Sequence, residues 1–196
     1  FPYTTLFRSL GIARRAEKGI ELRVHPTLIP DEQLIANVNG VKNAVLVQAN
    51  AVGPTLYYGA GAGAGPTASA VVADVIDIVR DISYTEDGAG TIPQLAFEAL
   101  TNVPILSREE MTTGYYIRLN AEDQTGVLAD VTTILSRAGI SIDAIMQQSR
   151  LKDLIPIVIL TDPIVESKMD DALAQIQALP AIRGEIVRIR LESLDS

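Results

Sequence analysis

Two short segments of this sequence carry residue types that could bind a charged small molecule. The first is the glycine–alanine run at residues 59–65, which is followed by Pro66. A helix that begins near this proline would offer free backbone N–H groups and the positive end of its dipole to an anion. The glycines would let the backbone approach that anion closely. Tight packing of the helix on a sheet, without any ligand, explains the same glycines.

The run also fits a dinucleotide-binding fingerprint, Gly59-x-Gly61-x-x-Ala64. That fingerprint requires a following parallel strand with an acidic residue about 20 positions later. In this sequence the required position falls in residues 85–88, which are turn-like. We therefore expect no complete dinucleotide-binding fold within the chain.

The second segment is a polar turn at residues 120–128, Asn-Ala-Glu-Asp-Gln-Thr-Gly-Val-Leu. A free amino acid carries a carboxylate, an ammonium group and a side chain. The N-terminus of a helix, together with a nearby carboxylate or carbonyl oxygen, could hold both charged ends of such a ligand. A plain helix cap with Asp123 in solvent explains the same residues without a ligand.

Other catalytic or metal chemistry is poorly supported by the sequence. The chain has no cysteine, which excludes disulfides, thiolate metal sites and a cysteine nucleophile. Its single histidine, His25, cannot form a multi-histidine site, so we expect no metal. Lys18 and Lys42 lie in polar stretches and are expected to be solvated rather than catalytic.

Composition limits the class of protein and its partners. The 196 residues are 47% hydrophobic, which is enough for one large or two small packed domains. The formal net charge of −8 repels the phosphates of nucleic acid and anionic membrane surfaces, so neither is an expected partner. Since no apolar run reaches the roughly 18 to 20 residues of a membrane-spanning helix, we expect a soluble cytoplasmic protein.

The elements around the glycine run are predicted to be strands followed by a helix. Residues 20–29 alternate apolar and polar side chains, which predicts a half-buried strand, and Pro26 places that strand at an edge or ends its pairing. Residues 44–49 and 55–58 read as two further short strands. After Pro66, apolar residues recur at helical spacing from Val71 to Ile82, which predicts a helix with one buried face.

The second half of the chain is predicted to alternate strands and helices around the polar turn. Strands are expected at residues 115–119, 141–147, 155–160 and 186–191, and helices at 127–138 and 165–179. This βαββαβ order is the ferredoxin-like arrangement. Between the halves, periodicity fades over residues 83–113, which we interpret as a linker with one short helix near 94–100.

Four segments resemble homoserine dehydrogenase in their order and spacing: LGIARR at 10–15, VHPTLIP at 24–30, GVKNAV at 40–45 and GAGAGAGPTASAVV at 59–72. The resemblance implies the reduction of aspartate 4-semialdehyde to homoserine with NADH or NADPH, a step toward threonine, methionine and isoleucine. It also implies that Gly63 contacts the NAD or NADP of the full-length enzyme. Gly61 and Gly65 are further candidates for that contact.

Residues 120–128 and 140–147 together resemble an ACT domain, a small regulatory module. The resemblance assigns an effector pocket to Asn120, Asp123, Gly126, Val127 and Leu128, with Gln147 reaching in from the second strand. It implies L-threonine as the effector and a homo-oligomer formed through the ACT and catalytic domains. The familiar proline before the glycine is Thr125 here, which we expect to cap the helix instead.

The expected fold class is α+β: a partial antiparallel sheet with a return helix, followed by a βαββαβ ferredoxin-like ACT domain. Residues 1–9 resemble a translated sequencing adapter, residues 10–82 a homoserine dehydrogenase catalytic-domain remainder, and residues 114–192 the ACT regulatory domain. The family carries its Rossmann domain and catalytic lysine upstream of this region. We therefore expect a carboxy-terminal fragment with no catalytic residue and no activity of its own.

Two other functions fit part of the sequence. A free-standing amino-acid-binding ACT regulator would explain the second half of the chain but not the dehydrogenase motifs of the first half. A structural oligomerisation module would bind no small molecule at all.

Overall fold

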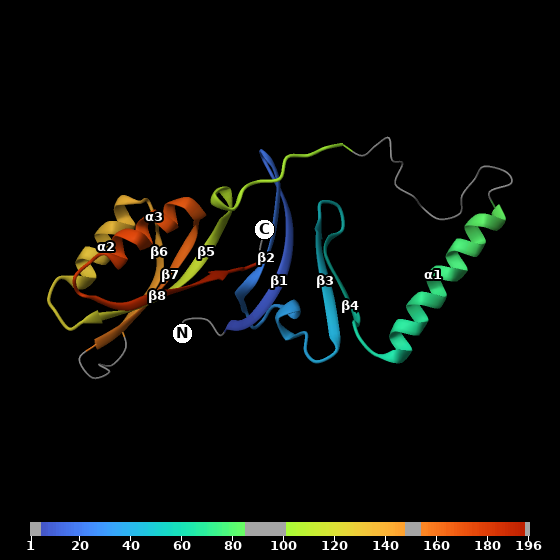
Figure 1. The fold of residues 1–196 in the computed structure, drawn as a ribbon, viewed down its shortest axis with the longest axis horizontal. Helices are drawn as coiled ribbons and strands as arrows, with labels where there is room; N and C mark the ends of the chain where they lie inside the picture. Colours follow the sequence, from blue (N-terminus) through green and yellow to red (C-terminus); the bar gives the residue numbers. More distant parts are fainter. Residues whose placement is uncertain (1–4, 85–100, 148–153, 195–196) are drawn as a thin grey trace. The chain divides into compact units, whose positions relative to one another are not determined.

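A computed structural model describes residues 5–84, 101–147 and 154–194 (Figure 1). It divides into two compact units, one of Phe1–Ala36 with Val103–Ser196 and one of Asn37–Asn102. The expected domain limits stay a prediction, and the boundaries of the two units fall at other positions in the chain. The difference arises because the first two strands pair with the second half of the chain rather than with the strands that follow them.

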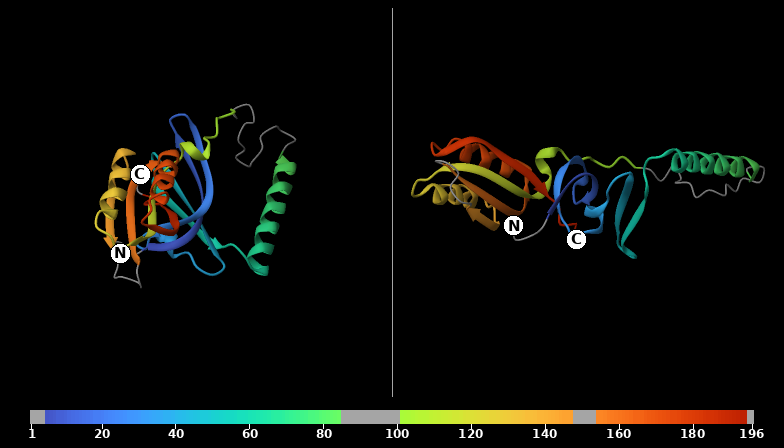
Figure 2. Two further views of the ribbon diagram at one scale, coloured as in Figure 1. Left: turned by 60° about the vertical axis from the view of Figure 1, so that its left-hand side comes forward. Right: turned by 90° about the horizontal axis from the view of Figure 1, so that it is seen from below.

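The first unit is built on a six-stranded sheet of order β1-β2-β8-β5-β7-β6. Its strands are β1 (Thr5–Ala16), β2 (Gly19–Pro30), β5 (Thr112–Glu122), β6 (Ile142–Gln147), β7 (Leu154–Val165) and β8 (Ile182–Leu191). Helices α2 (Val127–Arg137) and α3 (Glu166–Gln177) lie on one face of the sheet (Figure 2). The α+β class and the βαββαβ order from β5 to β8, called the ACT module below, are confirmed.

The hydrophobic core lies between the two helices and the ACT module's strands. Strand β5 points Tyr115, Ile117 and Leu119 into it, at the period of two that a strand imposes. Helix α2 contributes Val131 and Leu135, four residues apart on one face. Each large apolar side chain that is fully buried stabilises the fold by about 1.5 to 3 kcal/mol, so this layer positions everything attached to the sheet.

Strand β2 buries the face opposite to the one its pattern predicts. The buried side chains are polar, with Glu21, Arg23 and His25 between 4% and 8% exposed. The apolar Leu22 and Val24 are 45% and 83% exposed. The half-buried strand is confirmed, but its buried face is the polar one, because Arg23 pairs there with Glu21 and with Glu192, which lies just beyond β8.

The expectation for Pro26 is also wrong. Strand β2 is an interior strand between β1 and β8, and its pairing with β1 continues through Pro26, which lies opposite Ser9. The parallel pairing with β8 joins Thr27 to Arg190 and Leu28 to Leu191. Since this pairing starts one residue beyond the proline, Pro26 is not required to donate an N–H to β8.

The second unit contains a two-stranded sheet and one long helix. Strands β3 (Lys42–Ala49) and β4 (Gly53–Ala60) are antiparallel, and α1 (Ala64–Tyr84) follows, which confirms all three elements. Along α1, Val71, Val75 and Ile82 are 54–68% exposed, so the expected buried stripe is not covered by the described residues.

The other segments between these elements include two short 3-10 turns. Turns η1 (Leu34–Asn37) and η4 (Arg108–Glu110) flank the strands of the first unit. The short helix expected near residues 94–100 and most of the expected linker lie outside the described residues. Residues 5–9 belong to β1, so the structure does not set the adapter-like segment apart, and its origin stays a hypothesis. None of the described helices is long and apolar enough to cross a membrane.

The core assignment makes a stability prediction. Leu135→Ala should lower the free energy of unfolding by about 2 to 5 kcal/mol, because it removes a fully buried side chain and leaves a cavity. Val75→Ala, a change at an exposed position of α1, should alter it by about 0.5 kcal/mol or less. Urea denaturation of the purified chain measures both, and equal losses would show that the core is misplaced.

Candidate functional site

The glycine turn joins β4 to α1, and its three candidate glycines differ in what they require. Gly63 has a φ of +125°, a conformation that L side chains rarely adopt, and its carbonyl oxygen accepts the N–H of Thr67 at 3.0 Å. Gly61 donates its N–H to Val41 at 2.8 Å, and a Cβ there would collide with the Asn43 amide. A Cβ on Gly65 would meet open space among the described residues.

This geometry suits the N-terminal end of α1 for contact with an anionic group. The first amides of a helix have no intrahelical acceptor, and the helix dipole is positive there. Gly63, whose backbone cannot be copied by another residue without strain, is the strongest of the three candidates. The cofactor assignment of Gly61, Gly63 and Gly65 nevertheless stays a prediction. Lys42 is exposed, with its ammonium 5.7 Å from the ring centre of Tyr58.

The polar turn leads from β5 into α2, and Gly126 occupies its N-cap position. Gly126 has a φ of 97°, and no side chain caps the helix by a hydrogen bond. The expectation that Thr125 caps α2 is therefore wrong. The left-handed conformation at the cap requires a glycine, which displaces the threonine by one position out of capping reach.

The other effector candidates do not converge on one point within a single chain. Asn120 lies opposite Pro156 and Gln147 opposite Ile157, so both stand at the end of the sheet where β5 enters the turn. Ile157 belongs to the core beneath the helices, which places Gln147 on that face and Asn120 on the other. Val127 is buried in the core, whereas Asp123 is exposed and Leu128 is 36% exposed. Their assignment to an effector pocket stays a prediction.

A buried carboxylate stands at the start of α3. Glu166 is fully buried, forms an ion pair with Arg190 and accepts a hydrogen bond from the hydroxyl of Tyr115 at 2.9 Å. Arg108 and Arg188 approach the same carboxylate at 3.1 and 3.5 Å. Three arginines therefore share one carboxylate that water does not reach.

This setting changes the proton affinities of two groups. Burial by itself would raise the pKa of Glu166, but hydrogen bonds from Arg190 and Tyr115 and the charges of Arg190 and Arg188 lower it by more. The pKa of Glu166 consequently lies below its ordinary value. Burial and the hydrogen bond to Glu166 raise the pKa of Tyr115. Glu166 is thus held ionised and Tyr115 is held neutral.

A second buried charge cluster lies where β2 meets the end of β8. The side chains of Arg23 and Glu192 are 2% and 4% exposed and form an ion pair. Glu21 lies 3.3 Å from the Arg23 guanidinium, and the hydroxyl of Thr113 donates to Glu192 at 3.3 Å. Arg14 reaches Glu192 at 3.4 Å from β1. These contacts join three strands through charge rather than through apolar packing.

His25 borders this second cluster. Its Nδ1 lies 3.0 Å from the carbonyl oxygen of Pro26, and its Nε2 is buried without a hydrogen-bond partner among the described residues. Burial, together with the charges of Arg190 and Arg23, lowers the pKa of His25 by more than its hydrogen bond to Pro26 and the charge of Glu192 raise it. The ring is therefore held neutral, and a packing role for His25, rather than a role in proton transfer, stays a prediction.

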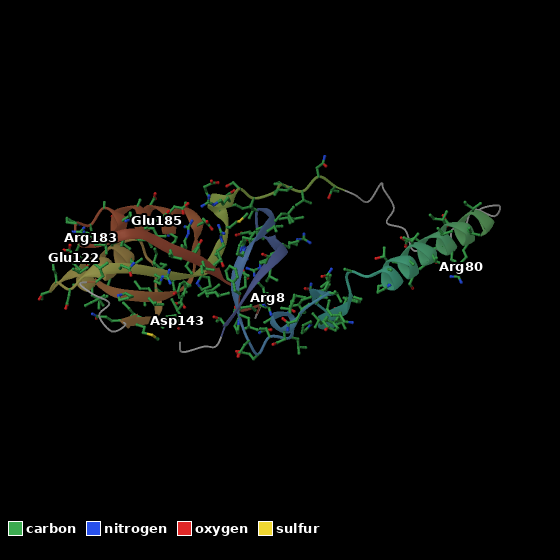
Figure 3. The ribbon with its side chains drawn as sticks, turned by 60° about the horizontal axis from the view of Figure 1, so that its bottom comes forward. Arg8, Arg80, Glu122, Asp143, Arg183 and Glu185 are labelled. Carbon is green, nitrogen blue, oxygen red and sulfur yellow. The ribbon has the colours of Figure 1, made fainter. Side chains whose placement is uncertain are left out.

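Sequence reasoning missed both clusters. The available signal was the alternation of charge in β8 and just beyond, where Arg188, Arg190 and Glu192 fall on one face of a strand. Charged residues in a strand are ordinarily read as its solvated face. By contrast, the pair Arg183 and Glu122 at the other end of β8 is exposed, as such a reading predicts (Figure 3).

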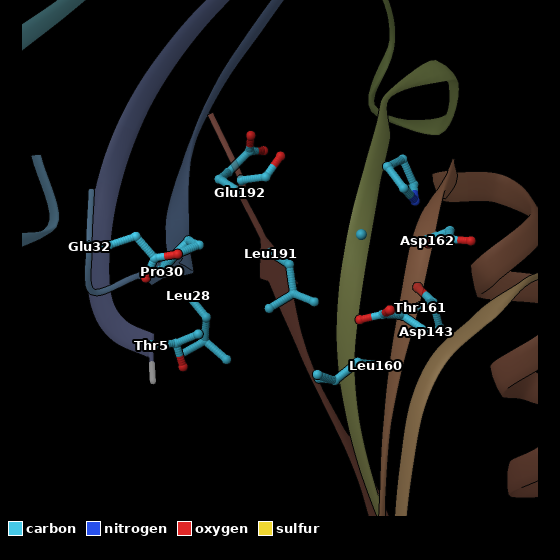
Figure 4. Close-up of a pocket in the computed structure, with 13 residues that line it drawn as sticks. Thr5, Leu28, Pro30, Glu32, Asp143, Leu160, Thr161, Asp162, Leu191 and Glu192 are labelled. Carbon is cyan, nitrogen blue, oxygen red and sulfur yellow. The ribbon is translucent and has the colours of Figure 1, made fainter. Parts of the chain in front are cut away.

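A hollow of about 390 Å³ opens on the face of the sheet that carries no helix (Figure 4). Leu28, Leu160 and Leu191 form its apolar part, and the carboxylates of Asp143 and Asp162 stand at its margin. It does not include the six effector candidates. Among the described residues no group of three or more histidines and carboxylates is placed to hold a metal ion.

Comparison with known proteins relates both halves of the chain to known families. Residues 4–76 match the model of the homoserine dehydrogenase family, and residues 115–180 match the model of the ACT domain. The chain is homologous to the homoserine dehydrogenases. The homoserine dehydrogenase of Pseudomonas aeruginosa is 52% identical over 192 residues, which are 96% of this chain and 44% of that protein. The enzyme of Neisseria gonorrhoeae is 49% identical over 94% of this chain and 43% of that protein.

A solved structure shares the fold as well as the sequence. The crystal structure of a homoserine dehydrogenase from Thiobacillus denitrificans matches with a TM-score of 0.88 and 53% identity, covering 97% of this chain and 43% of that one. The chain therefore spans less than half the length of these relatives. This share fits the carboxy-terminal part of a homoserine dehydrogenase, with the glycine turn in the first matched region and the polar turn in the second.

The Glu166 cluster makes a prediction about stability and its pH dependence. Because Glu166 has a lowered pKa, it stabilises the fold above its ordinary value of 4.5, and this contribution is lost as the pH falls through its folded pKa. Glu166→Gln should therefore lower the free energy of unfolding at pH 7, by up to about 3 to 5 kcal/mol, since it removes the buried charge that Arg190 pairs with. The difference from the wild type should shrink below pH 4.5.

Denaturation in urea at pH 7 and at lower pH measures this difference. Glu185→Gln, the same change at an exposed position of β8, serves as the control and should be nearly neutral at each pH. A Glu166→Gln variant that matches its control at pH 7 would show that the carboxylate does not hold the arginines.

Proposed function

We propose that this chain is the carboxy-terminal part of an NAD(P)-dependent homoserine dehydrogenase, which interconverts aspartate 4-semialdehyde and L-homoserine. The order of the two matched regions along one chain is the observation that carries the proposal. In the proposed whole enzyme, a Rossmann domain upstream of this region supplies most of the cofactor contacts and the catalytic lysine. The cofactor supplies the hydride, and this chain's glycine turn helps to position it.

The glycine turn supports a contact with the cofactor's anionic part. Gly63 holds a backbone conformation that admits no side chain without strain, and it directly precedes the first residue of α1. A ligand can therefore come as close as van der Waals contact to the backbone here. NAD and NADP share the chemistry that this turn would recognise, so both remain within the proposal.

The ACT module is proposed to sense L-threonine at an interface between two copies of the chain. Asn120 and Gln147 occupy the same end of the sheet but opposite faces, so a second copy would have to complete a pocket that includes both. A single sheet with open edge strands also favours pairing of copies. Threonine could regulate a distant active site only by binding one domain arrangement more tightly than another.

The catalytic part of the proposal predicts activity for the whole enzyme and none for this chain. The purified 196-residue chain should give no homoserine-dependent reduction of NADP, because loss of a catalytic acid–base group alone costs about 100- to 10,000-fold in rate. The product of the gene with its upstream coding region should catalyse that reaction. In this product, Gly63→Ala should raise the KM for NADP or NAD, whereas Gly65→Ala should have a smaller effect.

Absorbance of NADH or NADPH at 340 nm measures both the turnover of each protein and the KM of each glycine variant. Turnover by the 196-residue chain alone would contradict the assignment of the catalytic groups to the upstream region. Equal KM values for the two glycine variants would remove the cofactor role from Gly63.

The regulatory part predicts amino-acid binding by the chain as it stands. Titration with L-threonine should release or absorb heat, and Asp123→Ala or Gln147→Ala should weaken binding by about 1 to 3 kcal/mol if each makes a buried hydrogen bond to the ligand. Asp171→Ala, at an exposed position of α3, is the matched control and should bind threonine as the wild type does. Absence of heat from threonine, serine, isoleucine and methionine at millimolar concentration would leave the ACT module as a dimerisation unit.

A free-standing amino-acid-binding regulator is the second candidate function, and the ACT match alone favours it. The coding sequence upstream of Leu10 separates the two proposals. An in-frame Rossmann coding region supports the enzyme, and a native start codon beside Leu10 supports the regulator.

A further inference from the structure

The hairpin of β1 and β2 is bound near its turn by the segment that precedes the ACT module. Ile20 donates its N–H to the carbonyl oxygen of Pro104 at 2.8 Å, and Leu106 donates to the carbonyl oxygen of Ile20 at 2.9 Å. The backbone at Gly19 runs so close to Pro104 that a Cβ would collide with that carbonyl group. The segment that leads into the ACT module is therefore hydrogen-bonded to the end of the hairpin that carries its turn.

The same hairpin is bound again at its other end, by the segment that leaves the ACT module. Glu192 donates its N–H to the carbonyl oxygen of Leu28 at 3.0 Å. The hydroxyl of Thr27 donates to the carbonyl oxygen of Arg190 at 2.9 Å. Strand β2 thus cannot shift along β8 without breaking backbone contacts at both ends.

Buried charge fixes the middle of β2 in the same position. Arg23 pairs with Glu192, and both side chains are more than nine-tenths buried. Glu21 also lies 3.3 Å from Nη1 of Arg23, but it belongs to β2 itself, so Glu192 is the carboxylate that ties Arg23 to the end of β8. Since an unpaired buried charge is strongly destabilising, the pair permits one position of β2 against β8.

Strand β8 carries this constraint to the helices. Arg190 and Glu192 lie on the same face of the strand segment, and Arg190 pairs with Glu166 at the first residue of α3. A displacement of α3 therefore acts on the face of β8 that holds Arg23. Side chains of opposite charge transmit the displacement without an apolar interface that could slide.

We propose that Arg23 and Glu192 form a positioning pair that couples amino-acid binding at the ACT module to the β1–β2 hairpin, which belongs to the region matched by the dehydrogenase family. This inference rests on the proposed function, in which the ACT module binds L-threonine. Its role is to position the hairpin, not to take part in the chemical step. It selects the placement of the hairpin that the ligand-bound ACT module favours.

Hydrogen exchange of the 196-residue chain tests the pair without ligand. Glu192→Gln keeps the size of the side chain but removes its charge, so amides of β2 should exchange about 10- to 100-fold faster, while those of β7 should stay unchanged. Glu185→Gln, at an exposed position of the same strand, should change neither. Thr113→Val, which removes one hydrogen bond to Glu192, is the milder variant if Glu192→Gln does not fold.

A uniform rise of exchange over β2 and β7 in both variants would overturn the positioning role, because it would indicate general loss of stability.

Addition of saturating L-threonine then tests the coupling. In the wild type and in Glu185→Gln, threonine should slow exchange in β2 as well as in the ACT module. In Glu192→Gln, threonine should bind with an affinity within about threefold of the wild type but leave β2 exchange unchanged. Threonine binding to the wild type without any effect on β2 would overturn the coupling alone. Absence of threonine binding would overturn the proposed effector together with the coupling.

Discussion

Buried charge must be paired, and this constraint organises the first unit of the structure. Glu166 and Glu192 are carboxylates that are 0% and 3% exposed, and each is compensated by arginines from other elements. An ion of this kind would cost several kcal/mol if it were left alone in the interior. The positions of β2, β8 and α3 are therefore fixed together, because moving any one of them would separate a pair.

This arrangement gives β8 two roles in one strand. Along its whole length β8 completes the ferredoxin-like sheet beside β5, and its last two residues also pair with β2. The hydrophobic core beneath α2 and α3 stabilises the first role, whereas ion pairs specify the second. Moving β2 against β8 would separate the buried ion pair of Arg23 and Glu192, so the charged part is suited to transmit a change of position. That property is what regulation of a dehydrogenase by an attached ACT module would require.

The sequence predicted the elements well because their periodicities are local. Periods of two and of 3.6 residues located the strands and helices of the ACT module, and Gly126 and Gly139 mark ends of α2. The same local signal chose the wrong face of β2, since Glu192, which pairs with Arg23, lies 169 residues away in sequence. The periodicity of a short segment cannot indicate a partner that is so distant in sequence.

The candidate sites were also predictable only as far as they depend on residues that are close together in sequence. The requirement for glycine at Gly63 follows from one backbone angle, and the resemblance to a family located it. The effector candidates could be named but not placed, because Asn120 and Gln147 depend on register and on a second copy of the chain. Thr125 failed as a cap because the left-handed turn at Gly126 is a conformational preference that residue types alone do not reveal.

The central claim is that Arg23 and Glu192 stabilise each other across β2 and β8, and a double-mutant cycle measures this directly. Arg23→Met and Glu192→Leu should each lower the free energy of unfolding of the chain, by up to about 3 to 5 kcal/mol, because each removes one partner of a buried charge and leaves that charge with Arg14 or Glu21 alone. The double variant should lose at least about 1 kcal/mol less than the sum of the two single changes. Additive losses would contradict the account, since they would show that the two charges do not hold β2 and β8 together.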